Sequence, residues 1–557
     1  MNPGAIVAWV VAFVLLAVVV TGFARRLGWS APVLLVAVGA GISFVPGLPE
    51  VHVEPEFVLY GVVPPLLFAA AFGTYVIDVG ARRDTVVLLS VGLVVFTAFA
   101  VGWVTYLLLP AIGFAAAFAF AAVVAPTDAS AVTAIAGRLK LPHRVVTVLE
   151  GESLLNDATA LVLLNAAIAA IVSTSSPGLI AADLGLAVVG GVGVGLAIGW
   201  LVSTIRSRLR SPVLDTSLAL ITPYFAFIAA DAVLGSGVLA VVISALYLGF
   251  RSPMVQSAEA RFAEAVNWRT VSFLVENAVF LFIGLNAAGI IRRAVNELDG
   301  FWAPAGVCAV VIAALFLSRS AFVFLMVAVF RHGSRYMRAQ DLRWEYAVVV
   351  SAANVRGVVT LAAIFLLPPQ TPGRELLQLM AFVVVVVSLF TGILLPQLIR
   401  RLRLSAVDEK QEFADWEKLM AQAHARGLQR LEAEATDADH ERVLNQLRGN
   451  ATFISDSLEH ESDTGSESFL IAYRRLRRIM IRAERQYVIQ ARREHLFAET
   501  VVAAALRAID IEELTIRAAP VLEDTESSPH VDREGGAAAG QPRWRRRDHS
   551  TPKKDSA

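Results

Sequence analysis

Four polar residues lie close together in an apolar stretch of the chain: Glu152, Ser153, Asn156 and Asp157. An ionisable group in the hydrocarbon of a membrane costs at least ~2.5–3.5 kcal/mol, so such groups usually pair with one another or line an ion path. Ser153 and Asp157 are four residues apart, and Asn156 is adjacent, so in a helix their oxygens can converge on one side. Hard cations prefer such oxygen ligands. The sequence therefore predicts an ion site in this segment, for Na⁺, Li⁺ or a proton.

A proline interrupts the preceding apolar stretch beside another acidic residue. Pro126 is followed by Thr127 and Asp128. Proline lacks a backbone N–H, and the residue before it avoids helical geometry, so the helix should open near Thr127 and Asp128. Broken helices at membrane depth line a cavity or are buried in protein, and transporters use the freed carbonyls to hold ions. Asp128 could instead cap the following half-helix, which does not exclude its lining the site.

Glu152 needs a partner of opposite charge, because it lies about 100° around the helix from Ser153 and would otherwise be an isolated charge in hydrocarbon. Arg356 is the best candidate, since it is mid-span, stays charged and can grip a carboxylate with two hydrogen bonds. We expect Glu152 and Arg356 to form a buried structural pair. Glu276 and Arg319 are secondary candidates, expected to form a second structural salt bridge.

The composition is that of a membrane protein. Of the 557 residues, 56% are hydrophobic and 17% charged, and the mean hydropathy is +0.63. About thirteen apolar stretches are long enough to cross a core of ~30 Å. They lie near residues 5–24, 31–47, 57–75, 85–109, 111–136, 145–172, 184–204, 217–234, 236–250, 268–291, 301–330, 345–367 and 376–399. The sequence thus predicts an all-α polytopic membrane protein with about 13 transmembrane helices.

Basic residues in the loops predict the orientation of the chain. Alternate loops carry most of the Arg and Lys, whereas the intervening loops offer only Arg292, Arg293 and Arg374. The positive-inside rule then places the N-terminus outside and the C-terminus in the cytoplasm.

The chain divides into three parts by composition. Residues 1–403 form the expected transmembrane domain, 404–520 a charged, helix-prone cytoplasmic domain, and 521–557 a tail that should be disordered. Cys308 is the only cysteine, which excludes an internal disulfide. We expect no cofactor and no nucleic-acid partner. The region after Leu404 has no nucleotide-binding glycine pattern and no metal-ligand cluster among His424, His440, His460 and His495.

Four motifs resemble the monovalent cation/proton antiporter family, which contains bacterial and archaeal Na⁺/H⁺ antiporters and animal Na⁺/H⁺ exchangers. They are Pro126-Thr127-Asp128, Glu152-Ser153-Leu154-Leu155-Asn156-Asp157, Phe280 to Gly284, and Val355-Arg356-Gly357, within a resemblance that covers roughly residues 5–400.

The resemblance implies several properties. Asp157 would be the shared carrier of ion and proton, with Thr127, Asp128, Ser153 and Asn156 around it, and Na⁺ would bind at Asp157, Thr127 and Ser153. It similarly implies the Glu152–Arg356 contact. The family fold is a homodimer with inverted repeats and two crossed, broken helices, in the lipid of the cell membrane.

One departure from the family bears on ion preference. Relatives often carry an acidic residue after a Pro-Pro-Leu-Leu-Phe stretch, whereas this chain has Ala69 after Phe68.

The expected function is electroneutral Na⁺(Li⁺)/H⁺ antiport by alternating access, with Na⁺ and H⁺ competing for Asp157. Electrogenic relatives have a second aspartate where Asn156 stands, paired with an intramembrane lysine, and the only lysine before Arg403 is Lys140, in a predicted loop.

Other readings of the same residues stay open. A K⁺/H⁺ antiporter would use the same mechanism, because one oxygen-lined site can accept either ion. A channel would differ in showing flux that does not saturate. An intramembrane aspartyl hydrolase could use Asp128 and Asp157 as two carboxylates sharing a proton. However, neither aspartate lies in the Gly-x-Gly-Asp pattern that is typical of such enzymes.

Overall fold

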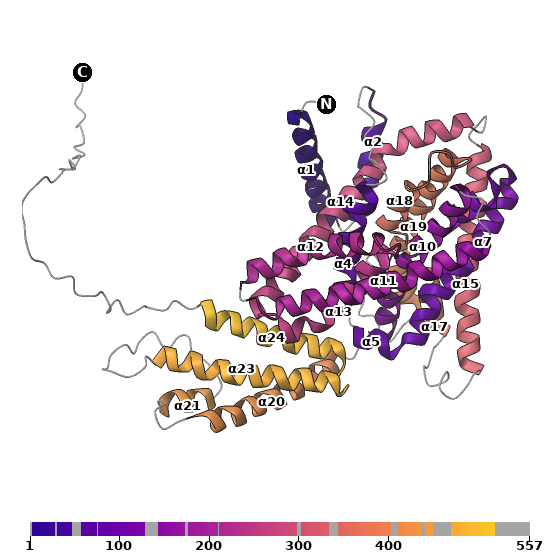
Figure 1. Cartoon of the computed structure of the whole chain (residues 1–557). Coiled ribbons are helices and arrows are strands. Elements are labelled where there is room, and N and C mark those ends of the chain that lie inside the picture. Colours follow the sequence, from indigo (N-terminus) through magenta and orange to yellow (C-terminus); the bar gives the residue numbers. More distant parts are fainter. Residues whose placement is uncertain are drawn as a thin grey trace, which may run out of the picture.

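The computed structural model describes residues 3–27, 30–46, 57–74, 76–128, 143–172, 177–209, 211–297, 302–332, 344–402, 409–435, 441–448 and 469–518. Every regular element within these ranges is a helix (Figure 1), which confirms the predicted all-α class. The expected disordered tail, 521–557, and the loop that contains Lys140 lie outside the described residues.

Most helices of the membrane part overlap the predicted apolar stretches, whereas α5 lies between two of them. The first half contains α1 (Pro3–Leu27), α2 (Ala31–Ser43), η1 (Val58–Val62), α4 (Val63–Phe72), α5 (Val76–Ala81), α6 (Arg83–Val87), η2 (Leu88–Gly92), α7 (Leu93–Leu108), η3 (Pro110–Ile112), α8 (Gly113–Val124) and α10 (His143–Val172). The second half contains α11 (Pro177–Arg206), α12 (Pro212–Asp231), α13 (Gly237–Val255), α14 (Ala258–Glu297), α15 (Trp302–His332), α17 (Trp344–Ala352), α18 (Val358–Ile364) and α19 (Arg374–Leu402).

The predicted number of membrane crossings is not confirmed. Within the described ranges, eight helical segments are long and apolar enough to span a membrane, and four shorter apolar helices accompany them. The count of thirteen stays a prediction.

Small residues let the membrane helices approach closely. A Cβ added to Gly39 on α2 would lie 2.6 Å from the carbonyl oxygen of Leu281, and one added to Gly284 on α14 would lie 2.8 Å from the Cα of Gly39. Van der Waals packing at such small-residue contacts replaces the hydrophobic effect between helices in lipid. These two glycines are therefore required by the α2–α14 contact.

Two interrupted helical segments meet in the interior. α8 ends at Val124, before Pro126, and residues 353–357 separate α17 from α18. The Asp128 N–H donates to the Val355 carbonyl (2.8 Å), and Arg356 Nε donates to the Val124 carbonyl (3.0 Å). Because the last carbonyls of a helix lack partners within it, these bonds satisfy groups that the breaks expose. The predicted opening beside Pro126 is confirmed.

The C-terminal helices form a group of their own: α20 (Glu409–Glu434), α21 (Glu441–Arg448), α23 (Phe469–Arg493) and α24 (Glu499–Ala518). Leu419, Ile481 and Val502 belong to its apolar core. Figure 1 shows α24 as the member nearest to the membrane helices. There Arg261 of α14 forms an ion pair with Asp510 of α24.

Candidate ion-binding site

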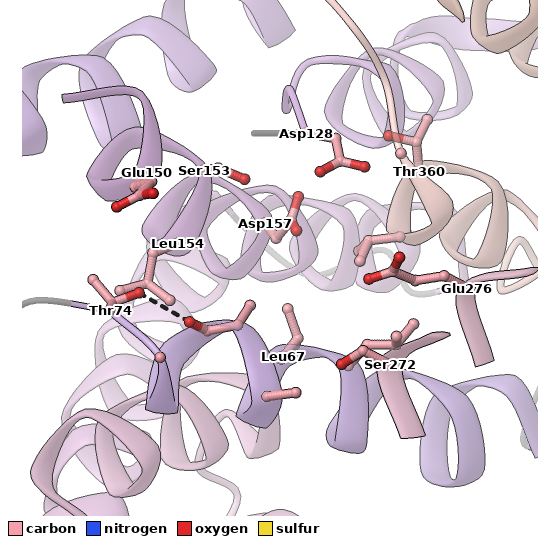
Figure 2. Close-up of a pocket in the computed structure, with 16 residues that line it drawn as sticks. Leu67, Thr74, Asp128, Glu150, Ser153, Leu154, Asp157, Ser272, Glu276 and Thr360 are labelled. Carbon is pink, nitrogen blue, oxygen red and sulfur yellow. Dashed lines mark hydrogen bonds between the residues drawn. The ribbon is translucent and has the colours of Figure 1, made fainter. Parts of the chain in front are cut away.

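A cavity of about 320 Å³ lies where the two helix breaks face α4, α10 and α14. Figure 2 shows this cavity with its lining side chains. Its polar lining residues are Thr74, Asp128, Glu150, Ser153, Asp157, Ser272, Glu276 and Thr360. The cavity thus gathers four carboxylates and four hydroxyls from helices that are distant in the sequence.

Three predicted residues meet in this cavity. Asp157 and Ser153 lie one turn apart on α10, and Asp128 reaches them from the first helix break. Figure 2 shows the carboxylates of Asp128, Asp157 and Glu276 directed into the same space. Among the described residues, none forms a hydrogen bond with Asp157. Its carboxylate oxygens are therefore available to a proton or a cation.

The other two predicted site residues lie behind the cavity wall. Thr127 and Asn156 are buried, and the Asn156 amide donates to the Thr127 carbonyl (2.8 Å). The Thr127 hydroxyl donates to Glu152 Oε1 (2.8 Å). Asn156 therefore holds the non-helical backbone against α10, and the role of Thr127 as a Na⁺ ligand stays a prediction.

The partner of Glu152 differs from the expected one. Arg319 on α15 contacts both oxygens of the Glu152 carboxylate, from Nη1 to Oε1 (2.6 Å) and from Nη2 to Oε2 (3.1 Å). The two side chains are only 2% and 3% exposed. The expected pairs Glu152–Arg356 and Glu276–Arg319 are both wrong. Arg319, and not Arg356, binds Glu152, and Glu276 lines the cavity.

Arg356 instead braces the backbone of both breaks. Its Nε donates to the Val124 carbonyl, and its Nη1 donates to the carbonyl of Asn354 (2.9 Å). The Arg356 N–H donates to Ser388 Oγ (2.9 Å). A guanidinium with five donors suits this role, since two interrupted helices leave several carbonyls without donors.

Sequence reasoning missed several polar lining residues, although two of them carried a signal. Glu150 precedes Asp157 by seven residues, which is two helical turns, so both lie on one face of α10. Ser272 precedes Glu276 by four residues on α14 and shares its face. Thr74 and Thr360 had no such signal, because Thr74 lies just after the end of α4 and Thr360 lies on α18.

Gly357 of the second break lies directly against Asp128 of the first. A Cβ added there would lie 2.7 Å from the Cβ of Asp128. Only a residue without a side chain lets Asp128 occupy this position, so Gly357 helps set the geometry of the cavity.

The comparisons with known proteins identify the family. The family model described as "Sodium/hydrogen exchanger, transmembrane" matches residues 12–401. The chain belongs to this sodium/hydrogen exchanger family. Its members are transporters, which removes the hydrolase reading.

Relatives of this exchanger extend the match to most of the chain. An uncharacterised Na⁺/H⁺ exchanger of Mycobacterium tuberculosis is 30% identical over 531 residues, 91% of this chain and 95% of the relative. A sodium, potassium, lithium and rubidium/H⁺ antiporter of Bacillus subtilis is 30% identical over 381 residues, 64% of this chain and 56% of the relative.

A solved structure supports the fold. The sodium proton antiporter MjNhaP1 from Methanocaldococcus jannaschii superposes with a TM-score of 0.59 at 20% identity, over 73% of this chain and all of that one. The chain is therefore a multi-pass membrane protein with an antiporter fold.

Proposed function

We propose that this exchanger moves Na⁺ or Li⁺ against H⁺, and that the two cations compete for Asp157. The observation that carries the proposal is the position of Asp157, which has no hydrogen bond from another described residue and faces Asp128, Ser153 and Glu276 in one cavity. A protonated Asp157 would exclude the metal ion, and a bound metal ion would exclude the proton. If only the loaded site crosses the membrane, exchange follows without covalent chemistry.

The proposed stoichiometry is one proton for one cation. Asn156 cannot carry a proton in the way that a second aspartate would, and its amide is engaged with the Thr127 carbonyl. Glu152 is held by Arg319 in a bidentate pair, and arginine keeps its charge. We assign the carrier role to Asp157, to which no described residue donates a hydrogen bond. Net current in proportion to flux under voltage clamp would contradict electroneutral exchange.

Glu276 is a candidate to replace the carboxylate that relatives often carry at the position of Ala69. Ala69 on α4 and Glu276 on α14 line the same cavity. We therefore assign to Glu276 a share of the negative charge that relatives place after Pro-Pro-Leu-Leu-Phe. A site rearranged in this way could also prefer K⁺, and the relative from Bacillus subtilis is named for K⁺ as well as Na⁺. K⁺/H⁺ antiport is the second candidate function.

The remaining assignments follow from charge and family. We place the protein in the cell membrane with its N-terminus outside, and we assign 1–403 to transport, 404–520 to a cytoplasmic domain and 521–557 to a tail. A homodimer is the expected assembly.

The test is cation-driven proton movement in acidified everted vesicles. Na⁺ or Li⁺ should dissipate the gradient with the wild type and fail to do so with Asp157→Asn. Asp183→Asn is the matched control, because Asp183 is exposed on α11 and is not among the residues that line the cavity. A response to K⁺ alone would establish the second candidate. No response to any of these cations from folded wild-type protein would refute both.

The role of Glu276 has its own test in the same assay. Glu276→Gln should raise the half-maximal Na⁺ concentration by about tenfold, equivalent to ~1.4 kcal/mol, because it removes a negative charge from the cavity. The added carboxylate of Ala69→Glu should restore affinity in the double variant. An unchanged half-maximal concentration in Glu276→Gln would remove Glu276 from the site.

A further inference from the structure

A second cavity lies far from the first one, among the C-terminal helices. Its volume is about 310 Å³, and it is lined by Arg478, Ile481, Arg482 and Arg485 of α23 and by Glu513 of α24. The three arginines are four and three residues apart, so they share one face of α23. The lining carries three positive charges and one negative charge.

Two of these arginines have no partner within the described part of the chain. Arg478 and Arg482 are exposed, and no hydrogen bond or ion pair joins either of them to a described residue. Like charges four residues apart on a helix repel each other and destabilise it. The pair therefore carries an electrostatic cost that no contact among the described residues offsets.

The third arginine links the cavity to the membrane part. Arg485 Nη2 donates to Glu513 Oε2 (2.6 Å) and to Asp510 Oδ1 (2.8 Å). Asp510 also accepts a hydrogen bond from Arg261 Nε of α14 (2.8 Å). The Nε of Arg485 is buried and has no acceptor among the described residues. Arg485 of the cavity and Arg261 of α14 thus bind the same carboxylate, that of Asp510.

We propose that this cavity binds a small ligand that carries phosphate groups. Arginine forks match phosphate oxygens with two hydrogen bonds each, and such charge-assisted bonds are about twice as strong as neutral ones. Among the described lining residues, Ile481 is the only apolar one, so the site suits a compact polar anion. The phosphate can belong to a free metabolite or to a lipid headgroup.

Binding would act on the contact with α14. A phosphate that bonds to Arg485 draws this arginine away from Asp510, because both anions use the same guanidinium. The pair between Asp510 and Arg261 would then lose its second cation, and the C-terminal helices would hold α14 differently.

The test is isothermal titration of the full-length protein in detergent with pyrophosphate. Wild type should bind with a dissociation constant below about 1 mM, and Arg482→Gln should weaken binding about tenfold, as expected for one lost charge-assisted contact worth ~1.4 kcal/mol. The matched control is Arg507→Gln, because Arg507 is exposed on α24 and its side chain donates to the Ala503 carbonyl of its own helix, outside the cavity lining. No binding to folded wild type, or equal weakening in both variants, would overturn the proposal.

A change of opposite sign makes the test specific to the cavity. Glu513→Gln removes the carboxylate that the described lining contains and should tighten binding, whereas Glu432→Gln, which removes an exposed carboxylate on α20, should not. An equal effect of the two variants on affinity would mean that only the net charge of the protein matters, and this would overturn the proposed site.

The source of the phosphate is read from a second arm. Pyrophosphate is titrated into protein in phosphatidylcholine nanodiscs with and without phosphatidic acid. Equal affinity for pyrophosphate in the two kinds of nanodisc would support a free ligand. Weaker pyrophosphate binding in the nanodiscs with phosphatidic acid would support a lipid headgroup in the same cavity, provided that Arg482→Gln abolishes this difference.

Discussion

Glu152 and Arg319 offer the sharpest test of how the membrane helices are joined. Both side chains are almost completely buried, and two hydrogen bonds of 2.6 and 3.1 Å connect them. Removing one partner leaves the other charge buried alone, which costs ~3–5 kcal/mol. Glu152→Gln and Arg319→Gln should therefore each destabilise the protein by about that amount.

The double variant provides the decisive quantity. Glu152→Gln/Arg319→Gln leaves no unpaired charge, so its destabilisation should fall short of the sum of the single variants by about 2–3 kcal/mol, the upper range for residues in direct contact. The corresponding cycle for Glu152 and Arg356 should give a coupling energy below about 1 kcal/mol, since no hydrogen bond joins these two and Arg356 bonds to backbone carbonyls.

Unfolding in mixed micelles with increasing denaturing detergent would measure the free energies, with transport in vesicles as a check that each variant is inserted. The reasoning is refuted if the coupling energy of Glu152 with Arg356 exceeds that with Arg319. That outcome would restore the pairing expected from sequence.

The remaining predictions concern the helix breaks and the C-terminal helices. Gly357→Ala should abolish or strongly reduce vesicle transport and destabilise the protein by ~1–3 kcal/mol, because the new Cβ displaces Asp128; Gly41→Ala, where no atom lies within 4 Å of the added Cβ, should keep transport. Burial alone would raise the pKa of Glu484, but its hydrogen bonds and the charge of Arg477 outweigh burial and hold this pKa below the ordinary value of 4.5. A lowered folded-state pKa stabilises the fold above the unfolded-state pKa, and this stabilisation is lost as the pH falls through the folded-state value. Hydrogen–deuterium exchange at α23, corrected for intrinsic rates, should therefore show acid-induced loss of protection in wild type and a constant, lower protection in Glu484→Gln; identical acid profiles would count against it.

The sequence alone was sufficient wherever the cause is local. Proline at position 126 opens a helix because of its own ring and missing N–H, and this holds whatever surrounds it. Ser153 and Asp157 share a face because four residues make about one helical turn. Apolar stretches mark the membrane segments because polar side chains are costly in hydrocarbon, and these segments are helices because lipid requires each one to satisfy its own backbone.

The tertiary structure decided which distant residues meet. Arg319 and Arg356 have the same side chain and both lie in apolar stretches, so nothing local distinguishes them as partners for Glu152. The choice depends on how α15 and the broken segment between α17 and α18 pack against α10, and this packing places Arg319 on the carboxylate and Arg356 on the freed carbonyls. In the same way, Glu276 and Ala69 share a cavity only because α14 packs against α4. Side-chain chemistry and helical period determined which groups could bind an ion, and the packing of the helices determined which of them face one another.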